Sequence, residues 1–128
     1  MPQATRPSIL VVEDNPVNMR LVRRILRTQG FAVEEAVTGY DALARLRERL
    51  PALILLDMQL PGLDGFSLAA MLKSDAQTRA IPLVATTAYA MIGDAERILA
   101  AGCDAYLSKP IDDAELIKVI ERCLEKSG

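Results

Sequence analysis

Five short apolar segments alternate with five amphipathic ones, and this alternation constrains the fold more than any other feature. The apolar segments are residues 8–12, 31–37, 52–56, 81–86 and 105–107. Each has the length of a strand; the first suits a strand buried on both faces, whereas 31–37 is half polar and suits an edge strand. Strict alternation of strands and helices predicts a parallel sheet with helices on both faces and right-handed crossovers. We therefore expect an α/β fold of the doubly wound class.

The segments between the strands carry helix-terminal residues. Asn15 followed by Pro16 predicts the start of the first helix, and Gly30 its end. The apolar face of this helix is predicted from Val17, Leu21, Ile25 and Leu26. The second helix is predicted to start with the pair Thr38 and Asp41 and to bury Leu43, Leu46 and Leu50. The remaining helices are expected at 66–72, at 95–102 with Ile98 and Leu99 buried, and from Asp112 onward, where Leu116, Ile117, Val119, Ile120 and Leu124 supply the apolar face.

The bulk properties favour one domain in the cytoplasm. The 128 residues contain no linker or internal repeat, so we expect a single domain with a core of about residues 7–125. The net charge of −2 gives no field for nucleic acid, and no apolar run could cross a membrane or serve as a signal peptide. Without histidine, and with two cysteines far apart, the chain excludes His-based catalysis and most zinc sites. Both thiols are expected to be reduced and buried.

Acidic residues follow two of the predicted strands. Glu13 and Asp14 come directly after the first strand, and Asp57 comes after the third. Ligands of doubly wound sheets lie beyond the carboxyl ends of the strands, so neighbouring strands would bring these carboxylates together. Each acid alone is more often a helix cap or a turn residue, and Asp14 could begin the first helix. The three together favour a hard cation such as Mg²⁺, which takes carboxylate and phosphate oxygens.

The last two strands end in a hydroxyl and an ammonium. Thr86 and Thr87 close the fourth strand, and Lys109 with Pro110 follows the fifth. A hydroxyl donor and a positive charge at this edge would suit a phosphoryl group. Alternatively, each threonine is an ordinary strand residue and Lys109 a solvated loop lysine. Pro110 can fix a sharp turn, including a cis one, that would aim the lysine inward.

Four motifs occur together, namely VVEDNPVN at 11–18, LLDMQLPGLDG at 55–65, TTAYA at 86–90 and YLSKPI at 106–111. In order and spacing they resemble the receiver domain of two-component response regulators, over nearly the whole chain. The segment 93–111 is most similar to DivK-type single-domain regulators and to the receivers of hybrid histidine kinases. The resemblance implies a (βα)5 flavodoxin-like fold with strand order 2-1-3-4-5. The starting Met and the compact end at Gly128 favour a free-standing regulator.

The resemblance also assigns the acceptor and the metal ligands. By position, Asp57 is the phosphoacceptor. Asp14 would bind Mg²⁺ directly and Glu13 through water, while Asp57 and the backbone carbonyl of Gln59 would be further ligands. Mn²⁺ is expected to substitute for Mg²⁺.

Three further residues receive roles around the phosphoryl group. Thr87 would hydrogen-bond it and Lys109 would contact it. Tyr106 would be the aromatic switch, changing rotamer when Thr87 moves, although it could be an ordinary strand aromatic. Thr86 rivals Thr87 on propensity, but the register of the family motif, with the small Ala88 following, favours Thr87.

Rates and docking are assigned by resemblance as well. Gln59 and Tyr89 stand at positions that tune rates, and a bulky Tyr89 that screens the phosphoryl group from water predicts slow self-dephosphorylation. A histidine-bearing partner is expected to dock near Asn15, Pro16, Met19 and Pro110.

The predicted function is a switch that accepts a phosphoryl group. Since the chain has no histidine, the donor must be another molecule, and the resemblance implies the phosphohistidine of a histidine kinase or histidine phosphotransferase. Output is expected through a downstream protein on the face made by helix four, strand five and helix five, without direct contact to nucleic acid. A phosphorylation-dependent homodimer is an open alternative.

Three rival functions are weighed against the switch. A phosphatase with an aspartate nucleophile would need a second Asp where Gln59 stands, and room for a substrate cap. A flavodoxin-like or nucleotide-binding module would need a glycine-rich cradle after the first strand, where this chain is acidic. A phosphorylation-independent interaction module with the same fold is the third alternative.

Overall fold

The computed structural model describes residues 6–88 and 92–127. Strands and helices alternate along the chain as the sequence predicts. The strands are β1 (Arg6–Val12), β2 (Phe31–Ala36), β3 (Leu53–Asp57), β4 (Leu83–Thr87) and β5 (Ala105–Ser108). The helices are α1 (Pro16–Thr28), α2 (Gly39–Glu48), α3 (Gly65–Ser74), α4 (Ile92–Ala100) and α5 (Asp113–Ser127). Predicted and observed boundaries differ by a few residues at most of the ends.

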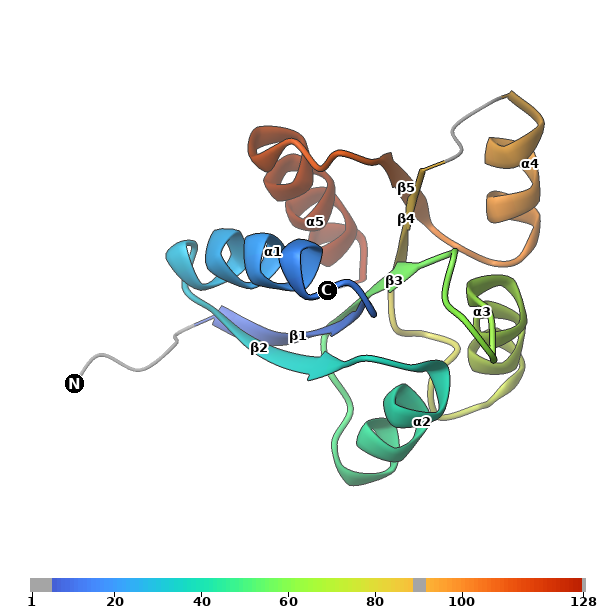
Figure 1. The fold of residues 1–128 in the computed structure, drawn as a ribbon. Coiled ribbons are helices and arrows are strands. Elements are labelled where there is room, and N and C mark those ends of the chain that lie inside the picture. Colours follow the sequence, from blue (N-terminus) through green and yellow to red (C-terminus); the bar gives the residue numbers. More distant parts are fainter. Residues whose placement is uncertain (1–5, 89–91, 128) are drawn as a thin grey trace.

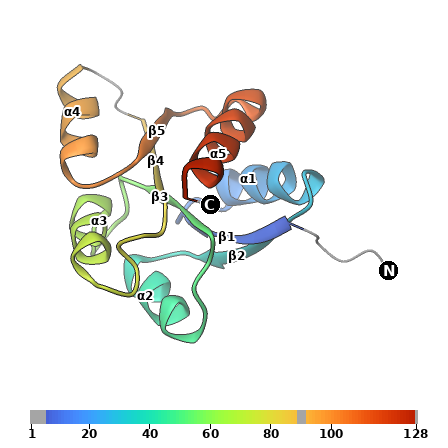
Figure 2. The same ribbon diagram turned by 180° about the vertical axis from the view of Figure 1, so that it is seen from behind.

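The strands form one parallel sheet in the order β2-β1-β3-β4-β5. This confirms the predicted doubly wound fold and its strand order. The half-polar β2 lies at an edge, as its composition indicates. Helices α1 and α5 cover one face of the sheet, while α2, α3 and α4 cover the other (Figures 1 and 2). The strand order reverses between β1 and β3, which places a ligand site beyond the carboxyl ends of these two strands.

The core is divided by the sheet into two layers. Ile9 and Val11 of β1 point toward α1 and α5, whereas Leu10 and Val12 point toward α2, α3 and α4. This alternation is the two-residue period of a strand. All of β3 is buried, Asp57 included. The central position of β3 in the sheet therefore explains why this strand is apolar on both faces.

The buried face of α1 differs from the predicted one. Met19, Val22 and Leu26 pack in the core, while Val17 is 69% exposed and Leu21 41% exposed. The prediction was wrong for these last two residues. They lie one turn apart on the side of the helix opposite the buried stripe, which follows the spacing i, i+3, i+7. Since α1 carries apolar residues on both sides, only packing against the sheet selects the buried one.

Two other leucines predicted to be in the core are exposed. Leu50 lies beyond the end of α2, and Leu99 lies on the outer side of α4, where Ile98 fills the core position instead. Leu46 is buried as predicted, together with Ala42. The last helix buries Leu116 and Ile120, as expected.

The predicted helix starts are confirmed. The Asn15 side chain accepts hydrogen bonds from the backbone N–H groups of Val17 and Asn18, at 2.9 and 3.1 Å, with Pro16 as the first helical residue. Because Asn15 caps α1, the alternative role of Asp14 as the residue that begins this helix does not apply. Thr38 accepts from the N–H of Asp41, and Asp112 from the N–H of Glu115. Gly30 follows α1 with a φ of +91°, the left-handed conformation that ends helices.

Both cysteines, Cys103 and Cys123, are free and buried, as predicted. Burial raises the pKa of Cys103 to about 11 and also raises the pKa of Cys123. Both thiols are therefore protonated at neutral pH. Within the described ranges 6–88 and 92–127, none of the helices is long and apolar enough to span a bilayer.

Candidate functional site

Three carboxylates converge where β1 and β3 end. Val12 pairs with Leu56 in the sheet, so the next residues of the two strands, Glu13 and Asp57, emerge side by side. One carboxylate oxygen from each of Glu13, Asp14 and Asp57 lies within 4.8 Å of the other two. Glu13 and Asp57 are buried and Asp14 is exposed. The convergence predicted from the strand ends is thus confirmed, and the cluster opens to solvent at Asp14.

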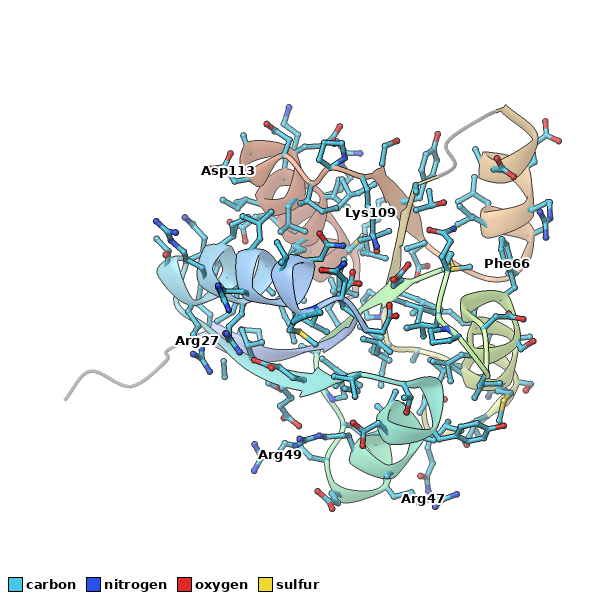
Figure 3. The ribbon with its side chains drawn as sticks, viewed as in Figure 1. Arg27, Arg47, Arg49, Phe66, Lys109 and Asp113 are labelled. Carbon is cyan, nitrogen blue, oxygen red and sulfur yellow. The ribbon has the colours of Figure 1, made fainter. Side chains whose placement is uncertain are left out.

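Lys109 reaches the same cluster from β5. Its Nζ lies 3.2 Å from Oε1 of Glu13 and 3.2 Å from Oδ2 of Asp57. Figure 3 shows Lys109 beside the carboxyl end of β3. The backbone N–H of Lys109 donates to the carbonyl of Thr87 at 2.8 Å, and its peptide bond to Pro110 is cis. The two ion pairs show that the lysine faces inward, as predicted from the sequence.

Burial and the neighbouring charges shift two pKa values in this cluster. Burial raises the pKa of Glu13, although the hydrogen bond from the N–H of Asn15 opposes the shift; repulsion from Asp57 adds to it. Burial alone would lower the pKa of Lys109, but attraction by Asp57 and Glu13 outweighs it and raises the pKa. The lysine is therefore a stable cation at neutral pH.

The donor set fits a divalent cation. Three carboxylates face a single ammonium, so the cluster carries an excess of negative charge. Oxygen ligands at this density are the kind that Mg²⁺ and Mn²⁺ prefer, and a bound cation relieves the repulsion between neighbouring carboxylates.

Gln59 contributes contacts that the sequence pattern did not indicate. Its backbone N–H donates to Oδ1 of Asp57 at 2.9 Å. Its side-chain Nε2 donates to Oγ1 of Thr87 at 2.9 Å, and its Oε1 accepts from the N–H of Ala88 at 3.0 Å. The sequence predicts that the backbone carbonyl of Gln59 binds the cation, and this role stays a prediction. The sequence offered one indication of these contacts. Gln59 is a polar residue two positions after Asp57, at the edge of the sheet where β4 also ends.

Thr87 and Thr86 occupy different places at the end of β4. Thr87 is buried and bonded to Gln59, whereas Thr86 pairs with Asp57 in the sheet and its carbonyl accepts from the N–H of Met58 at 2.9 Å. The hydroxyl of Thr87 is thus linked to the loop that follows Asp57. The predicted contact of this hydroxyl with a phosphoryl group remains a proposal.

Gly65 allows α3 to start directly against the end of β3. A Cβ at this position would lie 2.5 Å from Cα of Met58 and 2.8 Å from the carbonyl oxygen of Asp57. Both are backbone atoms, which cannot turn aside as a side chain can. The missing side chain of Gly65 thus allows the start of α3 to pack against the backbone of Asp57 and Met58.

Gly65→Ala is expected to destabilise the fold by about 1–3 kcal/mol, because the added methyl group overpacks this contact. Gly93→Ala is the matched control, because Gly93 lies in α4 with no atom within 4 Å of an added Cβ. The control should gain about 0.5–1 kcal/mol. Urea unfolding followed by circular dichroism measures both, and equal effects of the two substitutions would contradict the packing role of Gly65.

The remaining predicted site residues lie at several places. Tyr106, in β5, pairs with Ala85 and is 37% exposed. Asn15 and Pro16 are exposed at the start of α1, and Pro110 is exposed after Lys109. Tyr89 lies outside the described residues.

Met19 does not belong to a docking surface. Its side chain is only 5% exposed and packs between α1 and the sheet. The prediction that it contacts a partner was wrong, because an apolar residue on the inner stripe of α1 is covered by the sheet.

The fold and the site together define the class of this protein. The protein is a doubly wound α/β domain that carries an acidic cluster and an inward-facing lysine at the carboxyl edge of its sheet. Residues 9–121 match the response regulator receiver domain family, and the chain belongs to that family. It is a receiver domain of two-component signalling, as its motifs predicted.

Relatives of known identity agree with this assignment. The polar-differentiation response regulator DivK of Brucella ovis is 44% identical over 117 residues, which cover 91% of this chain and 95% of the relative. DivK of Brucella anthropi shows the same identity and coverage.

Solved structures are similar over the whole fold. The receiver domain of a sensor histidine kinase from Pseudomonas aeruginosa, with a magnesium ion coordinated in its active-site cleft, has a TM-score of 0.86 and 37% identity, covering 93% of this chain and 98% of that one. The receiver domain of a signal transduction histidine kinase from Syntrophus aciditrophicus has a TM-score of 0.87 and 31% identity, covering 94% and 92%.

Proposed function

We propose that the chain is a phosphoacceptor switch in which Asp57 receives a phosphoryl group from the phosphohistidine of a histidine kinase or histidine phosphotransferase. The observation that carries the proposal is the position of Asp57. Its Oδ2 lies 3.2 Å from Nζ of Lys109, within a cluster of carboxylates that suits a divalent cation. The magnesium ion in the similar Pseudomonas receiver supports the same cation here.

The transfer uses groups that the chain already holds in place. A carboxylate oxygen of Asp57 attacks the phosphorus, an O–P bond forms, and the P–N bond to the partner's imidazole breaks with its electron pair left on nitrogen. Lys109 faces the charge that develops on the phosphoryl oxygens, and the N–H of Gln59 helps to fix the Asp57 carboxylate. Glu13, Asp14, Asp57 and the backbone carbonyl of Gln59 are the proposed ligands of Mg²⁺, which when bound supplies charge neutralisation and orientation.

The output is proposed to pass through Thr87 and Tyr106. A phosphorylated Asp57 gains charge of about −2 and new acceptor oxygens, toward which the Thr87 hydroxyl can turn. Tyr106, one strand away and exposed at β5, can then change rotamer on the face of α4, β5 and α5. Coupling of about 1–3 kcal/mol between two existing states suffices for such a switch. A downstream protein is proposed to read this face.

The donor is proposed to dock at the edge of the sheet beside the acceptor. Asn15, Pro16 and Pro110 are exposed there and flank the carboxylate cluster. The proposed surface leaves out the buried Met19.

Asp14→Asn is expected to weaken Mg²⁺ binding about tenfold or more, because one charged ligand is lost. In chelator the same variant should be more stable than wild type by about 0.5–1 kcal/mol, since Asp14 repels the nearby carboxylates and none of the described ion pairs involves it. Isothermal titration and urea unfolding measure the two effects. The exposed Asp113→Asn serves as control and should change neither; an unaltered Mg²⁺ affinity in Asp14→Asn would rule out its role as a ligand.

Acetyl phosphate distinguishes a switch from a phosphatase. The switch predicts that wild type gains one phosphoryl group per chain in Mg²⁺ and none in EDTA, as read by intact mass. Rapid, sustained release of phosphate from a generic aryl phosphate, with many turnovers per molecule, would favour the enzyme and overturn the proposal.

A further inference from the structure

The side chain of Gln59 joins the segment that carries Asp57 to the carboxyl end of β4. Its Nε2 donates to Oγ1 of Thr87 at 2.9 Å, and its Oε1 accepts from the N–H of Ala88 at 3.0 Å. Its backbone N–H donates to Oδ1 of Asp57 at 2.9 Å. Gln59 therefore contacts the acceptor carboxylate and the end of β4 at the same time.

These contacts use groups that a phosphoryl group on Asp57 would need. A phosphoryl group presents acceptor oxygens, and a backbone amide has a single N–H to offer them. The N–H of Ala88 is already bound to Gln59, and the hydrogen bond from Nε2 of Gln59 to Oγ1 of Thr87 holds this hydroxyl in its present position. The carboxamide of Gln59 and a phosphoryl group thus compete for the end of β4.

We propose that Gln59 is a latch that holds Thr87 and Ala88 in the unphosphorylated arrangement. This inference rests on the function proposed above and deepens it. Phosphorylation of Asp57 releases both side-chain hydrogen bonds of Gln59, and the Thr87 hydroxyl moves to donate to the phosphoryl group. Because the latch opposes this change, a variant without the carboxamide reaches the phosphorylated arrangement more readily.

The test uses beryllofluoride, a mimic of the phosphoryl group, with Mg²⁺ and the whole chain. Gln59→Met keeps the length of the side chain and removes both hydrogen bonds, and Gln59→Ala is a second variant without the carboxamide. Gln77→Met is the matched control, because Gln77 is exposed and lies in the segment between α3 and β4, away from the end of β4. Backbone amide NMR follows the Ala88 signal and the binding of beryllofluoride, and isothermal titration gives the Mg²⁺ affinity.

Both Gln59 variants should bind beryllofluoride about 5- to 150-fold more tightly than wild type, which is the range expected for two neutral hydrogen bonds. The Ala88 amide proton should move upfield in the unliganded Gln59 variants, while Gln77→Met keeps the wild-type Ala88 signal and the wild-type affinities for beryllofluoride and Mg²⁺. A merely structural role of Gln59 would leave the binding constant unchanged or weaken it. If wild type binds beryllofluoride and both Gln59 variants bind it no more tightly, the latch is overturned alone. If wild type and Gln77→Met both fail to bind it, the proposed function is overturned and the latch with it.

Discussion

Asp57→Asn is expected to abolish phosphoryl uptake from acetyl phosphate. The amide is a far weaker nucleophile than the carboxylate, and the described chain places Asp57 alone among the three clustered acids in direct contact with both Lys109 and the N–H of Gln59. Incubation in Mg²⁺ followed by intact mass spectrometry should show wild type with one added phosphoryl group and the variant with none. The loss should exceed about a thousandfold in rate, as expected when a nucleophile is removed.

Asp113→Asn is the control for this loss. Asp113 is exposed at the start of α5, where its side chain accepts a hydrogen bond from the N–H of Ala114. The control should be labelled as fast as wild type. Labelling that persists in Asp57→Asn would show that another residue accepts the phosphoryl group.

Lys109→Met should have the second largest effect, on both chemistry and stability. Among the described residues, Lys109 supplies the one ammonium that lies within 4 Å of the Glu13 and Asp57 carboxylates. Loss of a charge aimed at the reacting group should slow phosphoryl uptake by about 10²–10³-fold. In chelator, the buried Glu13 and Asp57 would face each other without their cation, which should destabilise the fold by about 3–5 kcal/mol.

Mg²⁺ should restore more stability to Lys109→Met than to wild type, because a bound cation then supplies the missing positive charge. Urea unfolding in EDTA and in Mg²⁺ measures this difference. Lys118→Met, at an exposed position of α5, is the control and should change stability by no more than about 0.5 kcal/mol. A Lys109→Met protein as stable as wild type in EDTA would mean that the lysine does not compensate these carboxylates.

The sheet and the acidic cluster followed from local patterns. Short β-rich segments between helical ones define parallel strands, and the carboxyl ends of parallel strands meet at one edge. Glu13, Asp14, Asp57 and Lys109 could therefore be brought together from sequence, because each lies at the end of a recognisable strand or within two residues beyond it.

The features missed by the prediction depend on packing. In α1, Val17 and Leu21 are as apolar as Val22, and only the position of the sheet decides which side of the helix is buried. The bridge from Gln59 to Thr87 depends on the register between β3 and β4, which strand composition does not specify.

The proposed phosphoacceptor function depends most on Glu13, Asp14 and Asp57 forming a divalent cation site next to Lys109. Crystals grown with Mn²⁺ and measured at the manganese absorption edge test this directly, because the anomalous signal locates the ion without reference to the protein. We expect one strong anomalous peak within coordination distance of the Asp14 and Asp57 carboxylates, and loss of that peak when Asp14 is replaced by asparagine. The proposed function would be contradicted if no peak lay among these three acids at saturating Mn²⁺. A peak at another place that persists in the Asp14→Asn variant would contradict it as well.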